Sequence, residues 1–173
     1  LRFLKGSPDM GLYTVGVDAF RPYIENSRDV LNIHSEYVES NILDIEYPPD
    51  SFDCSIMIDV VEHLDKKQIV EFLPKLERIS RKIIIVTPNG FVDQEEFEEN
   101  PYQEHVSGWT VDDLSALGFS CSGLSGLKIL RGHMSVPKIR PKPLGYLLSD
   151  MSQVYVQLRP KLAFHILAIK SRI

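Results

Sequence analysis

The sequence has 173 residues, of which 43% are hydrophobic and 25% are charged, and its formal net charge is −5. This length and composition predict one soluble globular domain with enough chain to bury a core, and they exclude a repeat or low-complexity protein. A membrane-spanning chain is also excluded, because no apolar run reaches the roughly 20 residues that cross a bilayer. Isolated cysteines and the lack of a signal-peptide pattern favour a cytoplasmic protein.

Charge is unevenly distributed along the chain. The residues up to Phe119 include 23 acidic and 10 basic side chains, whereas the part from Ser120 onward has 9 basic side chains and only Asp150 against them. A basic C-terminal third is suited to an anionic partner or a membrane surface. The alternative is a basic face opposite an acidic one within the same fold.

Hydrophobic periodicity predicts strands that alternate with helices along the chain. The predicted strands cover residues 13–17, 34–38, 52–59, 82–88, 120–130 and 163–171, and the predicted helices cover residues 22–29, 65–81, 110–118 and 143–158. Asp65 and Gln68 form a candidate capping box, and Pro74 is expected to kink the helix that follows. Thr110 is a candidate N-cap, and Gly118 a candidate helix terminator.

This order of elements predicts an α/β fold. We expect a Rossmann-like, mostly parallel sheet with helices on both faces and an antiparallel strand pair at one edge. Residues 1–173 are expected to form a single domain. Within it, residues 136–158 contribute a basic segment and an amphipathic helix between the last two strands.

Polar side chains follow several of the predicted strands. Asp18 ends the first strand, Asn41 follows the second, and "IDVVEHL" places Asp59, Glu62 and His63 after the third. In open α/β sheets, ligands bind beyond the carboxyl ends of the strands. Asp18 in this position can accept two ribose hydroxyls, although Asp is also favoured as a helix N-cap.

The order and spacing of "VD", "DIEYPPDSFD" and "DVVEHL" resemble those of the class I S-adenosylmethionine-dependent methyltransferases, specifically their small-molecule group. The resemblance runs from about residue 13 to residue 119 and implies S-adenosyl-L-methionine as cofactor. Asp18 would hold the ribose, Asn41 would meet the adenine, and Asp59 would lie near the methionine part. The residues that the resemblance assigns to the cofactor are Asp18, Ala19, Phe20, Asn41, Ile42, Leu43, Asp59 and Val60.

The sequence departs from the family at its start. The family's first strand and its G-x-G-x-G loop should precede residue 13, and Gly6 and Gly11 do not reproduce their spacing. We therefore expect the sequence to be an N-terminally truncated version of a longer gene product.

Candidate catalytic residues are Glu62, His63 and His105. Methyl transfer is an in-line displacement that sometimes needs a base, and His63 is the better base at neutral pH. The alternative for His63 is that it only packs against or caps the next helix. For His105, lining the acceptor pocket and forming part of a structured turn are equally plausible roles. The D-x-x-E-H pattern resembles the metal-binding cluster of some quinone O-methyltransferases, but as a single cluster it leads us to expect no metal.

The sequence therefore predicts an S-adenosylmethionine-dependent methyltransferase for a small-molecule or lipid-like acceptor, with no nucleic-acid partner. The alternative is a non-catalytic scaffold with the same fold. A dinucleotide enzyme on a similar sheet is disfavoured by "DVVEHL". Residues 136–158, with Lys138, Arg140 and Lys142, predict a peripheral membrane contact or a lid, unless their helix merely packs its apolar face on the sheet.

Overall fold

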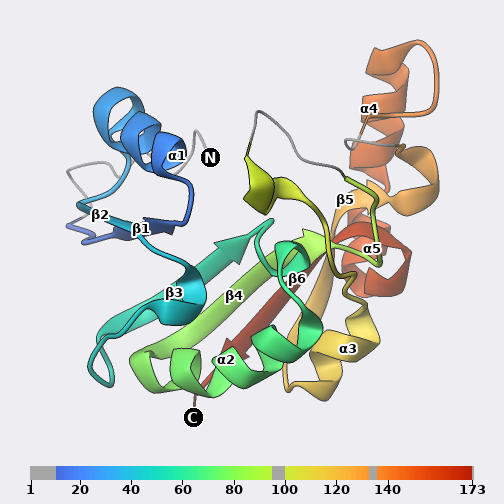
Figure 1. The fold of residues 1–173 in the computed structure, drawn as a ribbon. Coiled ribbons are helices and arrows are strands. Elements are labelled where there is room, and N and C mark those ends of the chain that lie inside the picture. Colours follow the sequence, from blue (N-terminus) through green and yellow to red (C-terminus); the bar gives the residue numbers. More distant parts are fainter. Residues whose placement is uncertain (1–10, 95–99, 133–135, 173) are drawn as a thin grey trace. The chain divides into compact units, whose positions relative to one another are not determined.

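A computed structural model of the chain describes residues 11–94, 100–132 and 136–172 (Figure 1). The chain divides into two compact units. The smaller unit comprises Leu1–Glu46 with Glu98–Tyr102, and the larger comprises Tyr47–Phe97 with Gln103–Ile173. Within the described ranges, no helix has the length and apolar character needed to cross a membrane.

The smaller unit is built on two parallel strands, β1 (Val15–Asp18) and β2 (Glu36–Glu39). Between them the chain forms α1 (Arg21–Asn26) and a π-helical turn (Ser27–Leu31). The register pairs Asp18 with Glu39, so the two strands end at the same edge. The Ser40 N–H donates to the Asp18 carbonyl at 3.0 Å, and this bond extends the pairing past the strand ends.

The larger unit is built on a four-stranded sheet with the strand order β3-β4-β6-β5. The strands are β3 (Phe52–Ile58), β4 (Ser80–Pro88), β5 (Ser120–Leu127) and β6 (Ala163–Ser171). β3 and β4 are parallel, whereas β6 lies between β4 and β5 and is antiparallel to both (Figure 1). The predicted antiparallel pair at one edge is confirmed.

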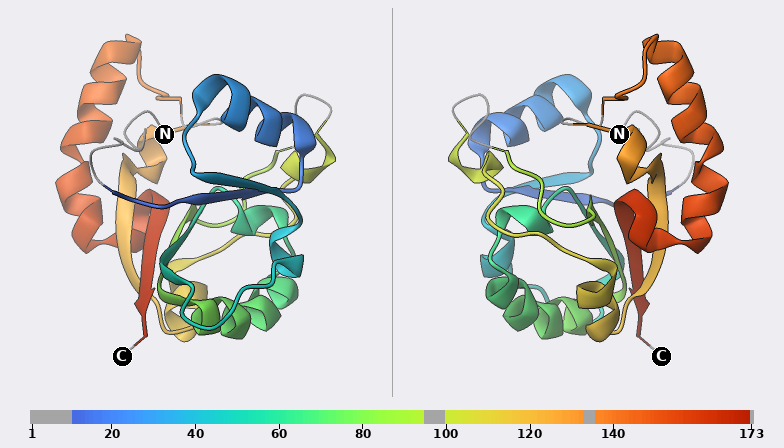
Figure 2. Two further views of the ribbon diagram at one scale, coloured as in Figure 1. Left: turned by 90° about the vertical axis from the view of Figure 1, so that its left-hand side faces the viewer. Right: turned by 90° about the vertical axis from the view of Figure 1, so that its right-hand side faces the viewer.

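Helices cover both faces of this sheet, as predicted (Figure 2). α2 (Lys66–Ile79) and α3 (Val111–Ala116) lie on one face, and α4 (Lys142–Met151) and α5 (Gln153–Leu158) lie on the other. The apolar stripe predicted for α2 is buried, and it consists of Ile69, Phe72, Leu73, Leu76 and Ile79. On the opposite face, α5 approaches β5 so closely that a Cβ on Gly123 would lie 2.3 Å from the carbonyl oxygen of Val156.

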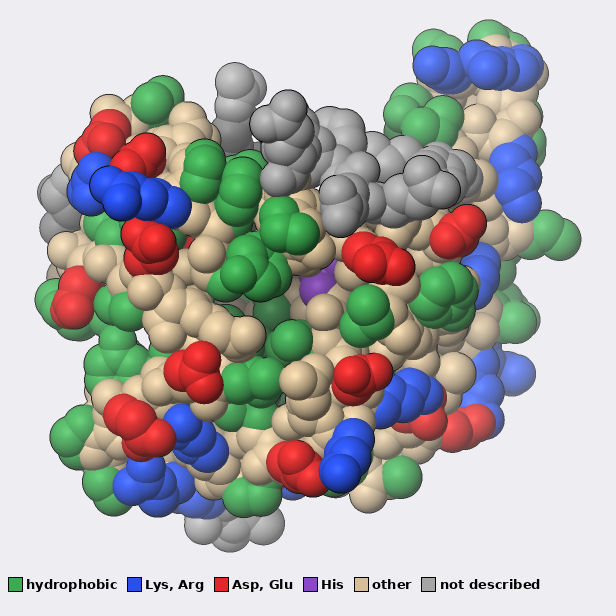
Figure 3. Space-filling view, in the orientation of Figure 1, with side chains coloured by type: hydrophobic (Ala, Val, Ile, Leu, Met, Phe, Trp, Pro, Cys, Tyr) green, Lys and Arg blue, Asp and Glu red, His purple; other side chains and the backbone are tan. Residues whose placement is uncertain are grey.

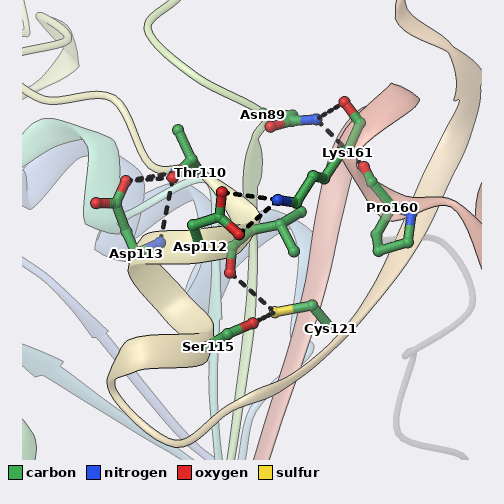
Figure 4. Close-up of polar contacts among 9 residues, drawn as sticks. Asn89, Thr110, Asp112, Asp113, Ser115, Cys121, Pro160 and Lys161 are labelled. Carbon is green, nitrogen blue, oxygen red and sulfur yellow. Dashed lines mark hydrogen bonds and ion pairs between the residues drawn. The ribbon is translucent and has the colours of Figure 1, made fainter.

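Capping interactions fix where α2 and α3 begin. The Asp65–Gln68 capping box is present, and α2 is continuous from Lys66 to Ile79 with Pro74 inside it. At α3, the Thr110 hydroxyl accepts the Asp113 N–H at 3.2 Å (Figure 4). The Asp113 carboxylate accepts from Lys66 Nζ at 2.8 Å, and chiefly this bond lowers the pKa of Asp113 to about 2.

The end of β4 is tied to the turn that precedes β6. The Asn89 side-chain amide donates to the carbonyls of Pro160 at 3.2 Å and Lys161 at 3.0 Å (Figure 4). It also donates to the Ala163 carbonyl at 3.0 Å. This interaction places the carboxyl end of β4 against the first residues of β6.

Residues 143–158, predicted as one helix, form two helices that meet at Ser152. Small side chains of this segment face the sheet, and Gly145 and Ser149 are buried. The large apolar side chains predicted to form its packed face point to solvent instead. The alternative in which this apolar face packs on the sheet is therefore wrong, because the residues buried in this segment are Gly145, Ser149 and Val156 instead.

Candidate functional site

Glu62 and His63 lie in the turn between β3 and α2. Asp59 has a positive φ of 51°, while its N–H still bonds to the Val86 carbonyl of β4 at 2.9 Å. A non-glycine residue in this conformation is uncommon and reverses the chain direction sharply. The chain then forms a single 3₁₀ turn, Val61–His63, which directs the Glu62 side chain into the protein.

Glu62 is a buried carboxylate with one satisfied oxygen. Its side chain and backbone are only 2% exposed, and Thr87 Oγ1 donates to Oε2 at 2.9 Å. Oε1 has no hydrogen-bond partner among the described residues. Burial raises the pKa of Glu62 to about 7, and the nearby charge of Asp59 contributes in the same direction. Burying a carboxylate with an unpartnered oxygen costs folding free energy. Groups with such shifted pKa values concentrate at functional sites.

Backbone hydrogen bonds bring His105 to this turn. The Glu62 carbonyl accepts the N–H groups of both Val106 and Ser107 at 3.0 Å. The Val61 carbonyl accepts from Ser107 Oγ at 3.2 Å and from the Trp109 indole N–H at 3.1 Å. Trp109 is buried and held by this bond, and the segment before it is held against Glu62.

His63 and His105 present the same ring nitrogen to the site. Their ring centroids lie 4.8 Å apart with an interplanar angle of 62°. Nδ1 of His63 is 2.9 Å from the Glu104 carbonyl, and Nδ1 of His105 is 2.6 Å from the Val92 carbonyl. Because a carbonyl oxygen only accepts, we assign the proton to Nδ1 in both rings, which leaves a lone pair on each Nε2. Burial lowers the pKa of His63, so its neutral form is favoured.

These side chains line a cavity of about 310 Å³ within the larger unit. Its lining includes the three predicted catalytic residues Glu62, His63 and His105, together with Asp59. Phe164 and His165 of β6 also line it and were not identified from the sequence. The only signal for His165 is its pairing with Pro88 across the antiparallel strands, and strand register is not readable from a single sequence.

In the smaller unit, Asp18 is the last residue of β1, and one of its carboxylate oxygens accepts a hydrogen bond. Oδ1 accepts the Phe20 N–H at 2.7 Å, and Oδ2 has no hydrogen bond within the described part of the chain. Burial raises the pKa of Asp18. A half-buried carboxylate with a remaining acceptor oxygen fits the hydroxyl donors of a ribose.

Asn41 also lies at this end of the β1–β2 pair. Its side-chain oxygen accepts the Leu43 N–H at 2.9 Å and thereby caps the 3₁₀ turn Ile42–Asp44. The same oxygen retains a second lone pair, as the predicted contact with adenine requires. Ala19, Phe20, Ile42 and Leu43 are half-buried. Six of the eight predicted cofactor residues therefore lie in the smaller unit, whereas Asp59 and Val60 lie in the larger unit with the catalytic candidates.

Comparison with known proteins shows what the chain is similar to. Residues 2–83 match the family profile described as "Methyltransferase domain". Among solved structures, a SAM-dependent methyltransferase from Archaeoglobus fulgidus is 18% identical, with 98% of this chain and 80% of that chain covered and a TM-score of 0.57. No curated protein matches the sequence.

Two further structures show the same fold. One is an S-adenosylmethionine-dependent methyltransferase from Mesorhizobium loti, 13% identical over 92% of this chain and 80% of that chain, with a TM-score of 0.51. The other is the plantazolicin methyltransferase BpumL in complex with a pentazolic desmethylPZN analogue and SAH. It is 16% identical over 99% of this chain and 71% of that chain, with a TM-score of 0.54.

The fold is that of the class I methyltransferases, as predicted. The family profile covers residues 2–83 of the 173, and the solved methyltransferase structures share the fold of the chain.

Replacing Asp18 tests the cofactor residues of the smaller unit. We expect Asp18→Ala to weaken S-adenosylmethionine binding by about 1–3 kcal/mol, the range for losing a hydrogen bond to a charged group. Calorimetric titration measures the affinity, and circular dichroism confirms that the fold is kept. Asp29→Ala, which removes an exposed carboxylate of the same unit, should leave the affinity unchanged. Equal affinities for Asp18→Ala and the unmodified chain would exclude Asp18 from the site.

Glu62→Gln tests the cost of the buried carboxylate. The folded pKa is raised, so the contribution of Glu62 to stability is fully present below its unfolded pKa, near 4.5, and is lost as the pH rises through about 7. At pH 8 we expect Glu62→Gln to be more stable than the unmodified chain by about 3 kcal/mol, because one pKa unit corresponds to about 1.4 kcal/mol. At pH 4 the difference should largely disappear.

Urea denaturation followed by the fluorescence of Trp109, the single tryptophan, measures this difference. EDTA in the buffer ensures that no cation pairs with the carboxylate. Glu71→Gln, at an exposed position of α2, is the matched control and should show no such dependence on pH. A stability difference for Glu62→Gln that is the same at both pH values would contradict the argument.

Proposed function

We propose that the chain transfers the methyl group of S-adenosylmethionine to a small, lipid-like acceptor. The observation that carries the proposal is the cavity of about 310 Å³ whose lining includes Glu62, His63 and His105. Its volume is at the lower end of the range for small-molecule sites. An acceptor head group with one nucleophilic atom fits such a space, with its remaining part outside.

The chemistry required of the chain is limited. S-adenosylmethionine supplies a methyl group that is already activated by the positive charge on its sulfur. The protein must therefore seat the nucleophile, exclude water and take up the proton that the nucleophile loses. The Nε2 lone pairs of His63 and His105 and the unpartnered oxygen of Glu62 are acceptors on residues that line the cavity.

An exposed apolar stripe on α4 and α5 supports the lipid-like character of the acceptor. The side chains share helical spacing and large exposure, with Leu158 at 81%, Met151 at 69% and Leu147 at 55%. The stripe also includes Leu144, Leu148, Val154 and Tyr155. Contiguous apolar surface of this kind marks an interaction site, because keeping these side chains in contact with water is unfavourable in free energy.

Cations flank the stripe and indicate what covers it. Lys138, Arg140 and Lys142 are exposed immediately before and at the start of α4. Figure 3 shows cationic and hydrophobic side chains together on the projecting part of the molecule at upper right. Apolar side chains beside cations match a bilayer surface with anionic lipids, where the apolar face enters the acyl boundary and the cations meet head groups. We therefore propose an anionic membrane surface as the partner of this stripe.

Methyl transfer to defined amphiphiles tests the proposed reaction. The acceptors share one alkyl tail and carry a phenol, a carboxylate, an amine or a thiol, and incorporation of labelled methyl is measured. We expect transfer to one of these head groups. His63→Gln should lower kcat at least tenfold with cofactor affinity within a factor of about two.

His34→Gln, in the smaller unit, is the control and should retain kcat. Cofactor binding without transfer to any acceptor would instead indicate a non-catalytic scaffold. Transfer only to an RNA or a peptide would contradict the lipid-like acceptor.

Vesicle binding tests the partner of the stripe. We expect the chain to bind vesicles rich in phosphatidylglycerol more tightly than vesicles of phosphatidylcholine. Joint charge reversal at Lys138, Arg140 and Lys142 should reduce this binding, most strongly at low salt, since exposed charges are screened within about 10 Å at 0.1 M ionic strength. Leu147→Ser with Met151→Ser should reduce it at all salt concentrations.

Charge reversal at Lys67, Lys75 and Lys82, elsewhere on the same unit, is the matched control. Sedimentation measures the alternative occupant, a second copy of the chain. Self-association that the apolar variants abolish, without any change in vesicle binding, would contradict the membrane contact.

A further inference from the structure

His165 brings an imidazole to the cavity from β6, a strand far along the chain from the turn that carries Glu62 and His63. Its position follows from the antiparallel register, in which it pairs with Pro88 of β4 on one side and with Leu124 of β5 on the other. The ring is half-buried, and burial lowers its pKa, so the neutral form is favoured. A neutral imidazole has one N–H donor and one lone pair, so the nitrogen that carries the proton decides what His165 offers.

One ring nitrogen of His165 is held by Ser125. Nδ1 lies 2.9 Å from Ser125 Oγ, and within the described ranges this is the single hydrogen bond of that hydroxyl. If the hydroxyl accepted from Nδ1, its own hydrogen would have no partner there, and an unsatisfied donor costs more free energy than an unused lone pair. We therefore assign the hydroxyl as the donor and Nδ1 as the acceptor, which places the ring proton of His165 on Nε2.

A β-bulge in β5 aims the Ser125 hydroxyl at His165. The pairing with β6 shifts register between Leu124 and Leu127, and the two residues between them are left-handed, with φ values of 65° for Ser125 and 70° for Gly126. Glycine is the residue that this conformation favours, whereas a serine is strained there. A serine in this place is therefore expected to act through its side chain, and bulges of this kind are common beside active sites.

Small polar side chains of α4 and of its junction with α5 hold the bulge in this shape. Ser149 is 0% exposed, and its hydroxyl accepts from Arg131 Nε at 2.8 Å and donates to the Ser125 carbonyl at 3.2 Å. Ser152, where the two helices meet, accepts the Leu127 N–H on its hydroxyl at 2.9 Å. The buried face of this segment thus fixes the backbone on both sides of the bulge, and with it the direction of the Ser125 side chain.

The N–H of His165 shares the cavity with three hydrogen-bond acceptors. These are the Nε2 lone pairs of His63 and His105 and the unpartnered oxygen of Glu62. A hydroxyl complements such a set, because it has one proton to give and two lone pairs. One lone pair accepts from His165, and the other remains for the bond to the methyl group. A neutral amine has a single lone pair, which the reaction itself uses.

We propose that His165 binds the acceptor through a hydrogen bond from Nε2 to a hydroxyl oxygen, and that Ser125 is the residue that positions His165. This assignment rests on the proposed methyl transfer and names the group that is methylated. The acceptor oxygen forms a bond to the methyl carbon as the bond from that carbon to sulfur breaks, and its proton passes to the Nε2 lone pair of His63. The products are a methyl ether, S-adenosylhomocysteine and protonated His63. His165 exchanges no proton, because its hydrogen bond stays with the oxygen throughout.

Nitrogen NMR of the whole chain, labelled in its histidine rings, tests the tautomer without any acceptor. Protonated and unprotonated ring nitrogens have well-separated chemical shifts, and the signals lost in His165→Gln identify the residue. At neutral pH we expect the proton of His165 on Nε2. Ser125→Ala should redistribute it over both nitrogens, whereas Ser122→Ala, at another serine of β5, should leave the spectrum of His165 unchanged. A proton on Nδ1 in the unmodified chain would overturn the proposal.

Phenol binding tests the contact with an oxygen. Phenol, the smallest probe of this class, should shift the Nε2 signal of His165. His165→Leu, which removes the donor, should weaken phenol binding about tenfold, the usual effect of losing one hydrogen bond. His165→Gln keeps an amide N–H and should bind phenol within a factor of about three. Aniline should bind the unmodified chain about tenfold more weakly than phenol does.

If His165→Leu does not fold, the spectra of the unmodified chain and of Ser125→Ala decide the question. The proposal is overturned if phenol leaves the His165 signals unchanged, if His165→Leu binds phenol as tightly as the unmodified chain, or if aniline binds as tightly as phenol. Methyl transfer to an amine but not to a phenol would contradict this assignment and leave the proposed function in place. Phenol bound at His165 in a chain that methylates none of the test amphiphiles would count against the proposed function alone.

Discussion

The site in the larger unit depends on two hydrogen bonds to one carbonyl oxygen. The backbone carbonyl of Glu62 accepts from Val106 and Ser107, the two residues that follow His105, and these bonds hold His105 near Glu62. These are backbone bonds, so they do not depend on which side chains the loop carries. The loop that bears His105 is thus anchored by its main chain, and its side chains remain free to differ in chemistry.

A second consequence concerns the balance between stability and chemistry. The Glu62 carboxylate is buried beside a cavity, where burial raises its pKa to about 7, and the Thr87 hydroxyl compensates only one of its oxygens. A glutamine at this position would make the fold more stable at neutral pH, yet its amide would be a much weaker proton acceptor than the carboxylate. Strain of this kind concentrates at functional sites, and the positive φ of Asp59 in the same turn is a further example.

The sequence predicted most of the fold and part of the site. Alternating periodicity, the Asp65 capping box and the polar residues after each strand were sufficient for the α/β class and for Glu62 and His63. His105 was a candidate through the family resemblance alone, because its position beside Glu62 depends on backbone bonds of an irregular loop more than 40 residues along the chain. Periodicity likewise identified the stripe on α4 and α5 but not its direction. Hydrophobicity favours burial, whereas the close approach at Gly123 admits only small side chains there.

The position of β6 between β4 and β5 has a consequence for how the larger unit forms (Figure 1). β4 ends at Pro88, but the strand that pairs with it on that side begins only at Ala163. During synthesis on a ribosome, β4 and β5 are therefore both made before the strand that joins them. Closing a loop of this length costs chain entropy before any contact repays it, so the sheet has a high contact order and completes slowly. Until β6 arrives, the apolar β4 edge is open to other chains, and a nascent molecule is exposed to aggregation during that interval.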